Sequence, residues 1–148
     1  MKYYKDKSNQ LFVNPIVANH TGLVEITKAE FDTMLLPTFS ELQTAKVSEL
    51  GIAYNDANEL DIAYLNTTFQ ADKASQDLIV SVLSAGSVPN GFFWLDKTNN
   101  QVAMTYAQLQ GLSGAILTRN QANFIKFQGL KAKVKLAKTQ AELGLIVW

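Results

Sequence analysis

A change of period between Gly91 and Leu109 constrains this chain more than any other feature. The stretch GFFWLDKTNNQVAMTYAQL places two short apolar runs around a polar turn, and the spacing of the apolar residues then lengthens. Alternation is typical of a strand, and a spacing of three or four residues is typical of a helix. The stretch therefore predicts a strand from Phe92 to Leu95, a turn, a return strand from Gln101 to Met104, and then a helix.

The helix that follows is predicted to be long. Thr105, with a glutamine three residues later, has the spacing of a capping box, and an apolar stripe continues from there to about Leu136. Asn120 and Asn123 interrupt this stripe. Two explanations stay open: a polar pair that specifies how the helix packs, or a bend near Gly129.

The N-terminal residues predict a small ββ(β)α module. Its expected elements are strands at Tyr3-Tyr4, Leu11 to Val13 and Leu23 to Ile26, and a helix that begins at a Thr27–Glu30 capping box and ends before Pro37. Pro15 is expected to end the first hairpin, and residues 36–39 are the best linker candidate. We therefore expect two domains, a module of residues 1–36 and a helix-rich domain of residues 37–148.

The middle of the chain predicts two further helices and a strand. The expected elements are a helix capped by Ser40 with Gln43 and reaching about Ala63, a strand from Tyr64 to Phe69, and a helix capped by Asp72 that directs Leu78, Ile79, Val82 and Leu83 to the core and ends at Gly86. Thr139 with Glu142 predicts one more capping box near the C-terminus. The fold class is thus α+β: a small β-hairpin and helix module, then a helix-rich domain with a short antiparallel sheet of about three strands and a long C-terminal helix.

Composition and charge narrow the classes of function. With no cysteine, the chain offers no disulfide, no thiolate zinc site and no cysteine nucleophile. No apolar run has the length of a membrane span or the form of a secretion signal, so neither a membrane nor secretion is expected. The net charge is zero, and we expect no nucleic-acid partner. The charges are segregated, because acids dominate from Glu41 to Asp77 and six cations without an acid lie from Arg119 to Lys138. They form either the solvated faces of two neighbouring helices or a basic strip for an acidic partner.

Catalytic and metal-binding patterns are missing. His20 is the only histidine, and no serine lies in a nucleophile turn. Asp56 to Asp61 is spaced like the start of a calcium loop but lacks the glycine and the glutamate that such a loop requires. We therefore expect no enzymatic activity, no cofactor and no metal.

Aromatic residues gather in the last third of the chain. They serve either as core or as a binding face, and three of them follow one another at Phe92, Phe93 and Trp94. Because neighbouring side chains of a strand point to opposite faces, Phe93 is expected to point away from the side that Phe92 and Trp94 share. One face of this hairpin could then be covered by the long helix and the other offered to a partner.

Two segments resemble proteins of tailed bacteriophages. MKYYKDKSNQLFV followed by GLVEITKAEFDTML resembles the start of tail fibre assembly proteins, with a "Y-x-D-x-x-N" hairpin before a "G-x-x-x-I-T-x-x-E" helix start. The region from TTFQADKASQDLIVSVL to the end resembles a phage and prophage tail-associated domain of unassigned function. The positions that match it are Phe69, Asp72, Ser75, Trp94, Thr105, Arg119, Thr139 and Trp148.

The resemblance implies a tail fibre assembly protein, a non-enzymatic chaperone that helps a receptor-binding fibre to fold, trimerise or attach. The implied partner is the fibre, with its C-terminal tip region as the expected contact, and the implied place of action is the host cytoplasm during phage assembly. The implied partner-binding residues are Tyr3, Tyr4 and Phe12 of the N-terminal module and Phe93 and Trp94 of the hairpin. An alternative is a structural or host-surface-binding component retained on the virion tail. The sequence also allows a homo-oligomer.

Overall fold

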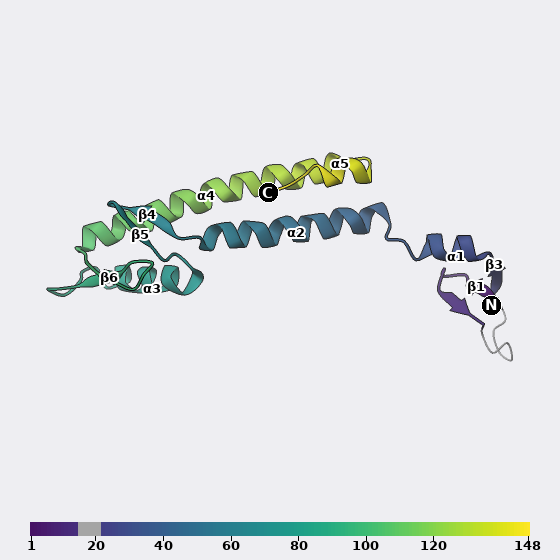
Figure 1. The fold of residues 1–148 in the computed structure, drawn as a ribbon, viewed down its shortest axis with the longest axis horizontal. Coiled ribbons are helices and arrows are strands. Elements are labelled where there is room, and N and C mark those ends of the chain that lie inside the picture. Colours follow the sequence, from purple (N-terminus) through teal and green to yellow (C-terminus); the bar gives the residue numbers. More distant parts are fainter. Residues whose placement is uncertain (15–21) are drawn as a thin grey trace. The chain divides into compact units, whose positions relative to one another are not determined.

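The computed structural model describes residues 1–14 and 22–148. The chain divides into two compact units, Met1–Leu42 and Gln43–Trp148, whose elements Figure 1 shows. Both units combine helices with short antiparallel strands, which confirms the predicted α+β class. The predicted boundary between domains after residue 36 stays a prediction. Two residues named from the sequence, Pro15 and His20, lie outside the described residues.

The first unit is a three-stranded sheet with one helix. Strand β1 (Tyr3–Lys5) lies between β2 (Leu11–Val13) and β3 (Val24–Ile26), and both pairings are antiparallel. Helix α1 (Lys28–Met34) begins after Thr27, which forms the predicted capping box. The three strands and the helix thus follow the order that the sequence predicts.

Helix α2 (Phe39–Glu59) has a different cap from the predicted one. The backbone N–H of Thr38 donates to Glu41 Oε2 at 2.6 Å, and the N–H of Glu41 donates to Thr38 Oγ1 at 3.3 Å. The predicted box at Ser40 and Gln43 is therefore wrong, because the helix has already begun at those positions. Thr38 and Glu41 have the same spacing as the predicted pair, and theirs is the box that forms.

A hairpin follows α2 where the sequence predicted the end of the helix and a single strand. Strands β4 (Ile62–Tyr64) and β5 (Thr67–Phe69) pair across a two-residue turn. The turn residues Leu65 and Asn66 both have positive φ, 49° and 61°. Such turns usually carry asparagine or glycine at both positions, so the leucine concealed the turn from sequence analysis. Because the hairpin starts here, α2 ends before its predicted limit.

The rest of the second unit contains, in chain order, α3 (Lys73–Ser84), β6 (Phe93–Leu95), β7 (Gln101–Ala103), α4 (Tyr106–Leu136) and α5 (Gln140–Gly144). The side chains of Asp72, Thr105 and Thr139 cap the three helices, as predicted. The predicted box at Thr139 forms only in part, because Glu142 Oε2 accepts from the backbone N–H of Lys138, at 2.6 Å, rather than from that of Thr139. Gly86 follows α3 with a φ of 77°, the left-handed conformation expected after a helix end. None of the helices in the described part of the chain is both long enough and apolar enough to cross a membrane.

One main core joins α3, both hairpins of the second unit and the first half of α4. Its buried residues are Phe69, Ala71, Ile79, Trp94, Met104, Leu109, Leu112 and Ile116. Val82 and Leu83 of α3 pack against this cluster, as predicted. The prediction for Leu78 is wrong: 55% of its surface is exposed, and it is not among the residues that pack against this cluster.

Helices α2 and α4 lie side by side and run in opposite directions (Figure 1). Gln43 Nε2 donates to the carbonyl oxygen of Val134 at 2.8 Å near one end of the pair. The rings of Tyr54 and Phe127 stack with their centroids 5.1 Å apart. Towards the other end of the pair, polar side chains form a network of hydrogen bonds around Asn58.

Candidate functional site

The strand β6 holds two aromatic residues in opposite environments. Trp94 is 9% exposed and lies in the core, with its ring centroid 6.2 Å from that of Phe92. Phe93, the residue between them, is 43% exposed. This confirms the predicted alternation of side chains along the strand. Because Trp94 is buried, it offers little surface to a partner. Its role as a partner-binding residue stays a prediction, and the structure does not favour it.

A hollow lies beside Phe93. It has a volume of about 340 Å³ and is lined by Gln70, Ser75, Leu78, Phe93, Trp94 and Leu95. Leu78 and Leu95 are 55% and 40% exposed. These three side chains, Leu78, Phe93 and Leu95, form an uncharged apolar area that we call the Phe93 surface. Sequence analysis named Phe93 and missed the other two, because Leu78 was assigned to the core.

The turn of the β6–β7 hairpin fixes this surface in place. Asp96 Oδ1 accepts hydrogen bonds from the backbone N–H groups of Thr98 and Asn100 at 2.8 and 2.9 Å, and from the hydroxyl of Thr98 at 2.8 Å. The hydrogen bonds from Asn100 and Thr98 to the charged carboxylate lower the pKa of Asp96 to about 2. The backbone of Asp96 also forms an antiparallel β-bridge with that of Phe69, whose side chain is fully buried. The strand that carries Phe93 is therefore anchored at its end.

The N-terminal hairpin contains a turn of the same kind. Asp6 Oδ1 accepts hydrogen bonds from the backbone N–H groups of Ser8 and Gln10 at 2.8 and 2.9 Å and from the hydroxyl of Ser8 at 2.7 Å. Asn9 has the same positive φ, 65°, as Asn99 in the second turn. The two turns read Asp-Lys-Ser-Asn and Asp-Lys-Thr-Asn, so similar sequences give the same hydrogen-bond pattern. The hydrogen bonds from Ser8 and Gln10 lower the pKa of the Asp6 carboxyl.

The three candidate residues of the first unit lie on opposite faces of its sheet. The ring of Tyr3 contacts that of Phe31 in α1, with centroids 4.7 Å apart. Tyr4 and Phe12 are directly opposite each other in β1 and β2, and both lie on the face turned away from Tyr3. Both are half-buried. The hydroxyl of Tyr4 donates to Glu25 Oε2 at 3.3 Å. Tyr3 is thus part of the packing of α1, and Tyr4 and Phe12 share the other face.

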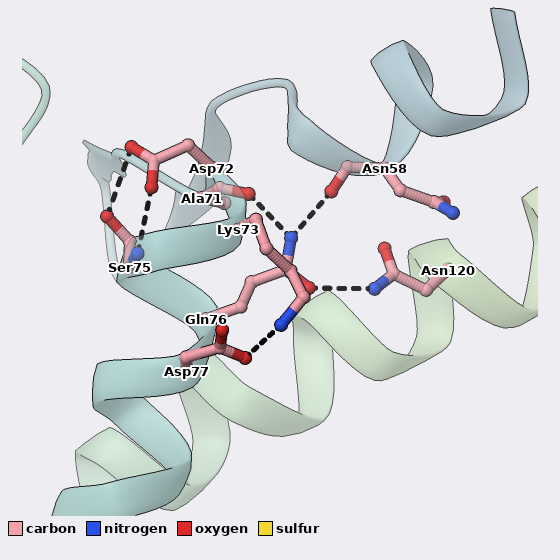
Figure 2. A network of polar contacts seen from close by, with 8 residues as sticks. All are labelled: Asn58, Ala71, Asp72, Lys73, Ser75, Gln76, Asp77 and Asn120. Carbon is pink, nitrogen blue, oxygen red and sulfur yellow. Dashed lines mark hydrogen bonds and ion pairs between the residues drawn. The ribbon is translucent and has the colours of Figure 1, made fainter. Parts of the chain in front are cut away.

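A polar network in the second unit was not predicted. Gln76 Nε2 donates to the carbonyl oxygens of Asn58 and Ala71, both at 2.7 Å, and its Oε1 accepts from Asn120 Nδ2 at 3.1 Å (Figure 2). The guanidinium of Arg119 donates to the carbonyl oxygens of Asn58 and Leu60. Side chains from α3 and α4 therefore satisfy carbonyls at the C-terminus of α2, where a helix leaves them without partners.

This network supports the first of the two explanations for the asparagines of α4, a polar pair that specifies how the helix packs. Asn123 Nδ2 donates to Asn58 Oδ1 at 2.9 Å, and Asn120 bonds to Gln76, so the polar pair fixes how α4 packs against its neighbours. Partial burial lowers the pKa of Arg119, whose charge is shared with backbone oxygens rather than with an acid. The arrangement holds three helices in register.

No group that could hold a metal ion is present among residues 1–14 and 22–148. The acids of this part of the chain do not come together in groups of three. His20, which the sequence analysis considered as a catalytic residue and set aside, is outside the described part.

Comparison with known families places most of the chain in a family. Residues 41–146 match the model of DUF4376, a domain of unknown function, and the chain therefore belongs to this family. The match includes the Phe93 surface and the polar network. It covers the C-terminal region for which the sequence resembles a domain of unassigned function. Neither a curated protein nor a solved structure shows significant similarity to the chain.

Proposed function

We propose that this protein is a tail fibre assembly protein of a tailed phage or prophage, a non-enzymatic chaperone for a receptor-binding fibre. The resemblance of the two segments quoted above supports this proposal, whereas membership of a family of unknown function does not indicate a function. The structural observation on which the proposal rests is the Phe93 surface. The ring of Phe93 is 43% exposed, and the next residue of the strand, Trp94, is buried. The buried neighbour holds the strand, so the ring of Phe93 is presented in a fixed orientation.

The physical need for such a helper lies in the fibre. Fibres built from intertwined β-strands have long unpaired edges and must form contacts between distant parts of the chain, so their folding intermediates expose apolar surface and aggregate. A protein that covers an apolar tip during assembly reduces this loss. The partner proposed here is the C-terminal tip region of the fibre, bound at the Phe93 surface.

The exposed Phe93 surface has the chemistry that this role requires. Its three apolar side chains surround a hollow lined by no charged residue, so it suits an uncharged apolar segment of a partner. Aromatic residues in such positions contribute more binding free energy than most interface residues. The half-buried Tyr4 and Phe12 of the first unit form a second candidate contact.

Co-expression tests the proposal. The fibre protein encoded beside this chain is produced with and without it, and soluble trimeric fibre is measured after centrifugation. We expect more soluble trimer when the chain is present, and a complex that survives gel filtration. No gain and no complex would contradict the proposal. If the protein were then found in purified virions, the alternative of a structural or host-surface-binding tail component would replace it.

A further inference from the structure

Helix α4 has apolar side chains on two faces. One face is buried in the second unit through Leu109, Leu112, Ile116, Leu130 and Val134. On the other side, Leu117, Phe124 and Ile125 are 67%, 50% and 63% exposed. A helix that is apolar on both faces is normally covered on both, and within the second unit these three side chains of α4 stay exposed.

The exposed residues form a continuous stripe along α4. The α4 stripe consists of six exposed residues with spacings that place them on one side of the helix: Leu117, Gln121, Phe124, Ile125, Gln128 and Ala132. None of them carries a charge. At 1.5 Å of rise per residue the stripe is about 22 Å long. This length is enough for a second helix to pack along it.

The α4 stripe is symmetric about its own centre. Its midpoint falls between Phe124 and Ile125, and Gln121 and Gln128 lie at equal distances along the chain on either side of it. A large residue, Leu117, stands at one end, and a small one occupies the equivalent position at the other end. A face with this arrangement fits a copy of itself that runs in the opposite direction, because a two-fold axis pairs residue i with residue j and j with i.

We propose that the α4 stripe is the interface through which two copies of this chain form an antiparallel dimer. The two-fold axis passes between Phe124 and Ile125, so that these two residues meet their counterparts at the centre. Gln121 of each copy then faces Gln128 of the other, where two amides can exchange hydrogen bonds. Leu117 lies over Ala132 of the other copy, and a large side chain thus packs against a small one.

The charges of α4 favour the antiparallel orientation. Residues 106–118 contain no charged side chain, whereas Arg119, Lys126, Lys131, Lys133 and Lys135 all lie in the remainder of the helix. An antiparallel pair places the cationic half of one helix beside the neutral half of the other. A parallel pair would bring like charges together, which is unfavourable, and it would also align the two helix dipoles.

Measurement of mass against concentration tests the dimer. Because the contact involves one helix from each copy, it is small, and we expect the weight-average mass of the full chain to rise from monomer towards dimer as the concentration increases. Replacement of the central aromatic, Phe124→Ser, should weaken the association by about tenfold or more. Leu117→Ser should also weaken it, whereas Leu36→Ser, which removes a leucine of the same 67% exposure outside the stripe, should not.

Cysteine cross-linking tests the orientation. The chain has no cysteine, so each introduced thiol is unique. In the antiparallel dimer, a mixture of Gln121→Cys and Gln128→Cys chains should form a disulfide-linked dimer upon mild oxidation, and either variant alone should form much less, because a disulfide requires close Cα atoms. Circular dichroism should show the same helix content in all variants.

Three results would overturn the proposal. The first is a mass that stays monomeric up to millimolar concentration. The second is cross-linking of each single-cysteine variant with itself as efficiently as in the mixture, which would indicate a parallel pair. The third is an association that Leu117→Ser and Phe124→Ser leave unchanged. The chain could also stay monomeric while the fibre protein protects the thiol of Gln121→Cys from alkylation. In that case the α4 stripe contacts the fibre instead of a second copy.

Discussion

Asn123 of α4 donates its side-chain amide to Asn58 Oδ1 of α2 at 2.9 Å, across the contact of the two antiparallel helices. Asparagine side chains between helices specify one packing arrangement, because any shift leaves the amides without partners. This pair, together with the Gln76–Asn120 bond, defines how α2, α3 and α4 meet.

The first prediction concerns this pair. Asn123→Ala leaves the amide of Asn58 without its partner, so we expect the free energy of unfolding to fall by about 1 kcal/mol. Gln110→Ala, a change at an exposed glutamine of the same helix, should leave it nearly unchanged. Urea unfolding of the two variants measures the difference. Equal stability of both would show that the asparagine pair does not hold the helices.

The second prediction concerns the C-terminus of α2. Arg119→Ala removes the guanidinium that donates to the carbonyl oxygens of Asn58 and Leu60, and we expect a loss of about 1–3 kcal/mol in unfolding free energy. Arg119→Lys should restore only part of it, since an ammonium lacks the planar fork of donors. Hydrogen exchange of the α2 amides near residue 58 should quicken in both variants. Full rescue by lysine would contradict the account.

The third prediction compares two glycines of α4. A Cβ added at Gly111 would lie 1.9 Å from the hydroxyl oxygen of Tyr64, so Gly111→Ala must displace this ring and should destabilise the protein by about 1–3 kcal/mol. A Cβ at Gly114 would meet no atom within 4 Å. Gly114→Ala should therefore stabilise the helix, by up to about 1 kcal/mol. Thermal unfolding of the two variants should move the midpoint in opposite directions, and a shift in the same direction would show that the tyrosine is not packed there.

The fourth prediction concerns pH. The pKa of Asp96 is lowered to about 2 in the folded protein, below its ordinary 3.8, so the ionised carboxylate stabilises the fold. This contribution is fully present above about pH 4 to 5 and is lost as the pH falls towards 2. We expect the unfolding midpoint of the unchanged protein to fall more between about pH 5 and 2 than that of Asp96→Asn, which cannot titrate there. The other carboxyl groups, Asp6 among them, titrate in both proteins, so their contribution cancels in the difference between the two unfolding midpoints. If the midpoints of the two proteins fell in parallel with pH, the stabilising role of the Asp96 carboxylate would be contradicted.

Local signals in the sequence predicted the elements that they control directly. The capping boxes at Thr27 and Thr105 start helices where predicted, and the Asp-Lys-Thr-Asn turn produces the β6–β7 hairpin, because these patterns act over only a few residues. The alternation of Phe93 and Trp94 also followed from the strand period.

The remaining features depend on contacts between residues far apart in the chain. The Leu65-Asn66 turn carries a leucine in a conformation that leucine rarely adopts, so local propensity missed it. Arg119 reaches carbonyls at the end of α2, and no short pattern links it to Asn58. Leu78 of α3 and Phe93 of β6 line the same hollow, which the spacing of α3 alone could not show.

The fifth prediction tests the central claim, that the Phe93 surface binds the fibre. Phe93→Ser removes the exposed ring while the buried Trp94 and the turn at Asp96 stay, so the variant should fold with an unchanged near-ultraviolet spectrum. The control is Leu145→Ser, which removes a leucine that is 83% exposed and lies outside this surface.

The most direct measurement is the affinity of these two variants and the unchanged protein for the purified fibre tip, by calorimetry. We predict that Phe93→Ser weakens binding by about tenfold or more, as expected for an aromatic residue at the centre of an interface, and that Leu145→Ser binds normally. Equal affinity of Phe93→Ser and the unchanged protein would contradict the claim.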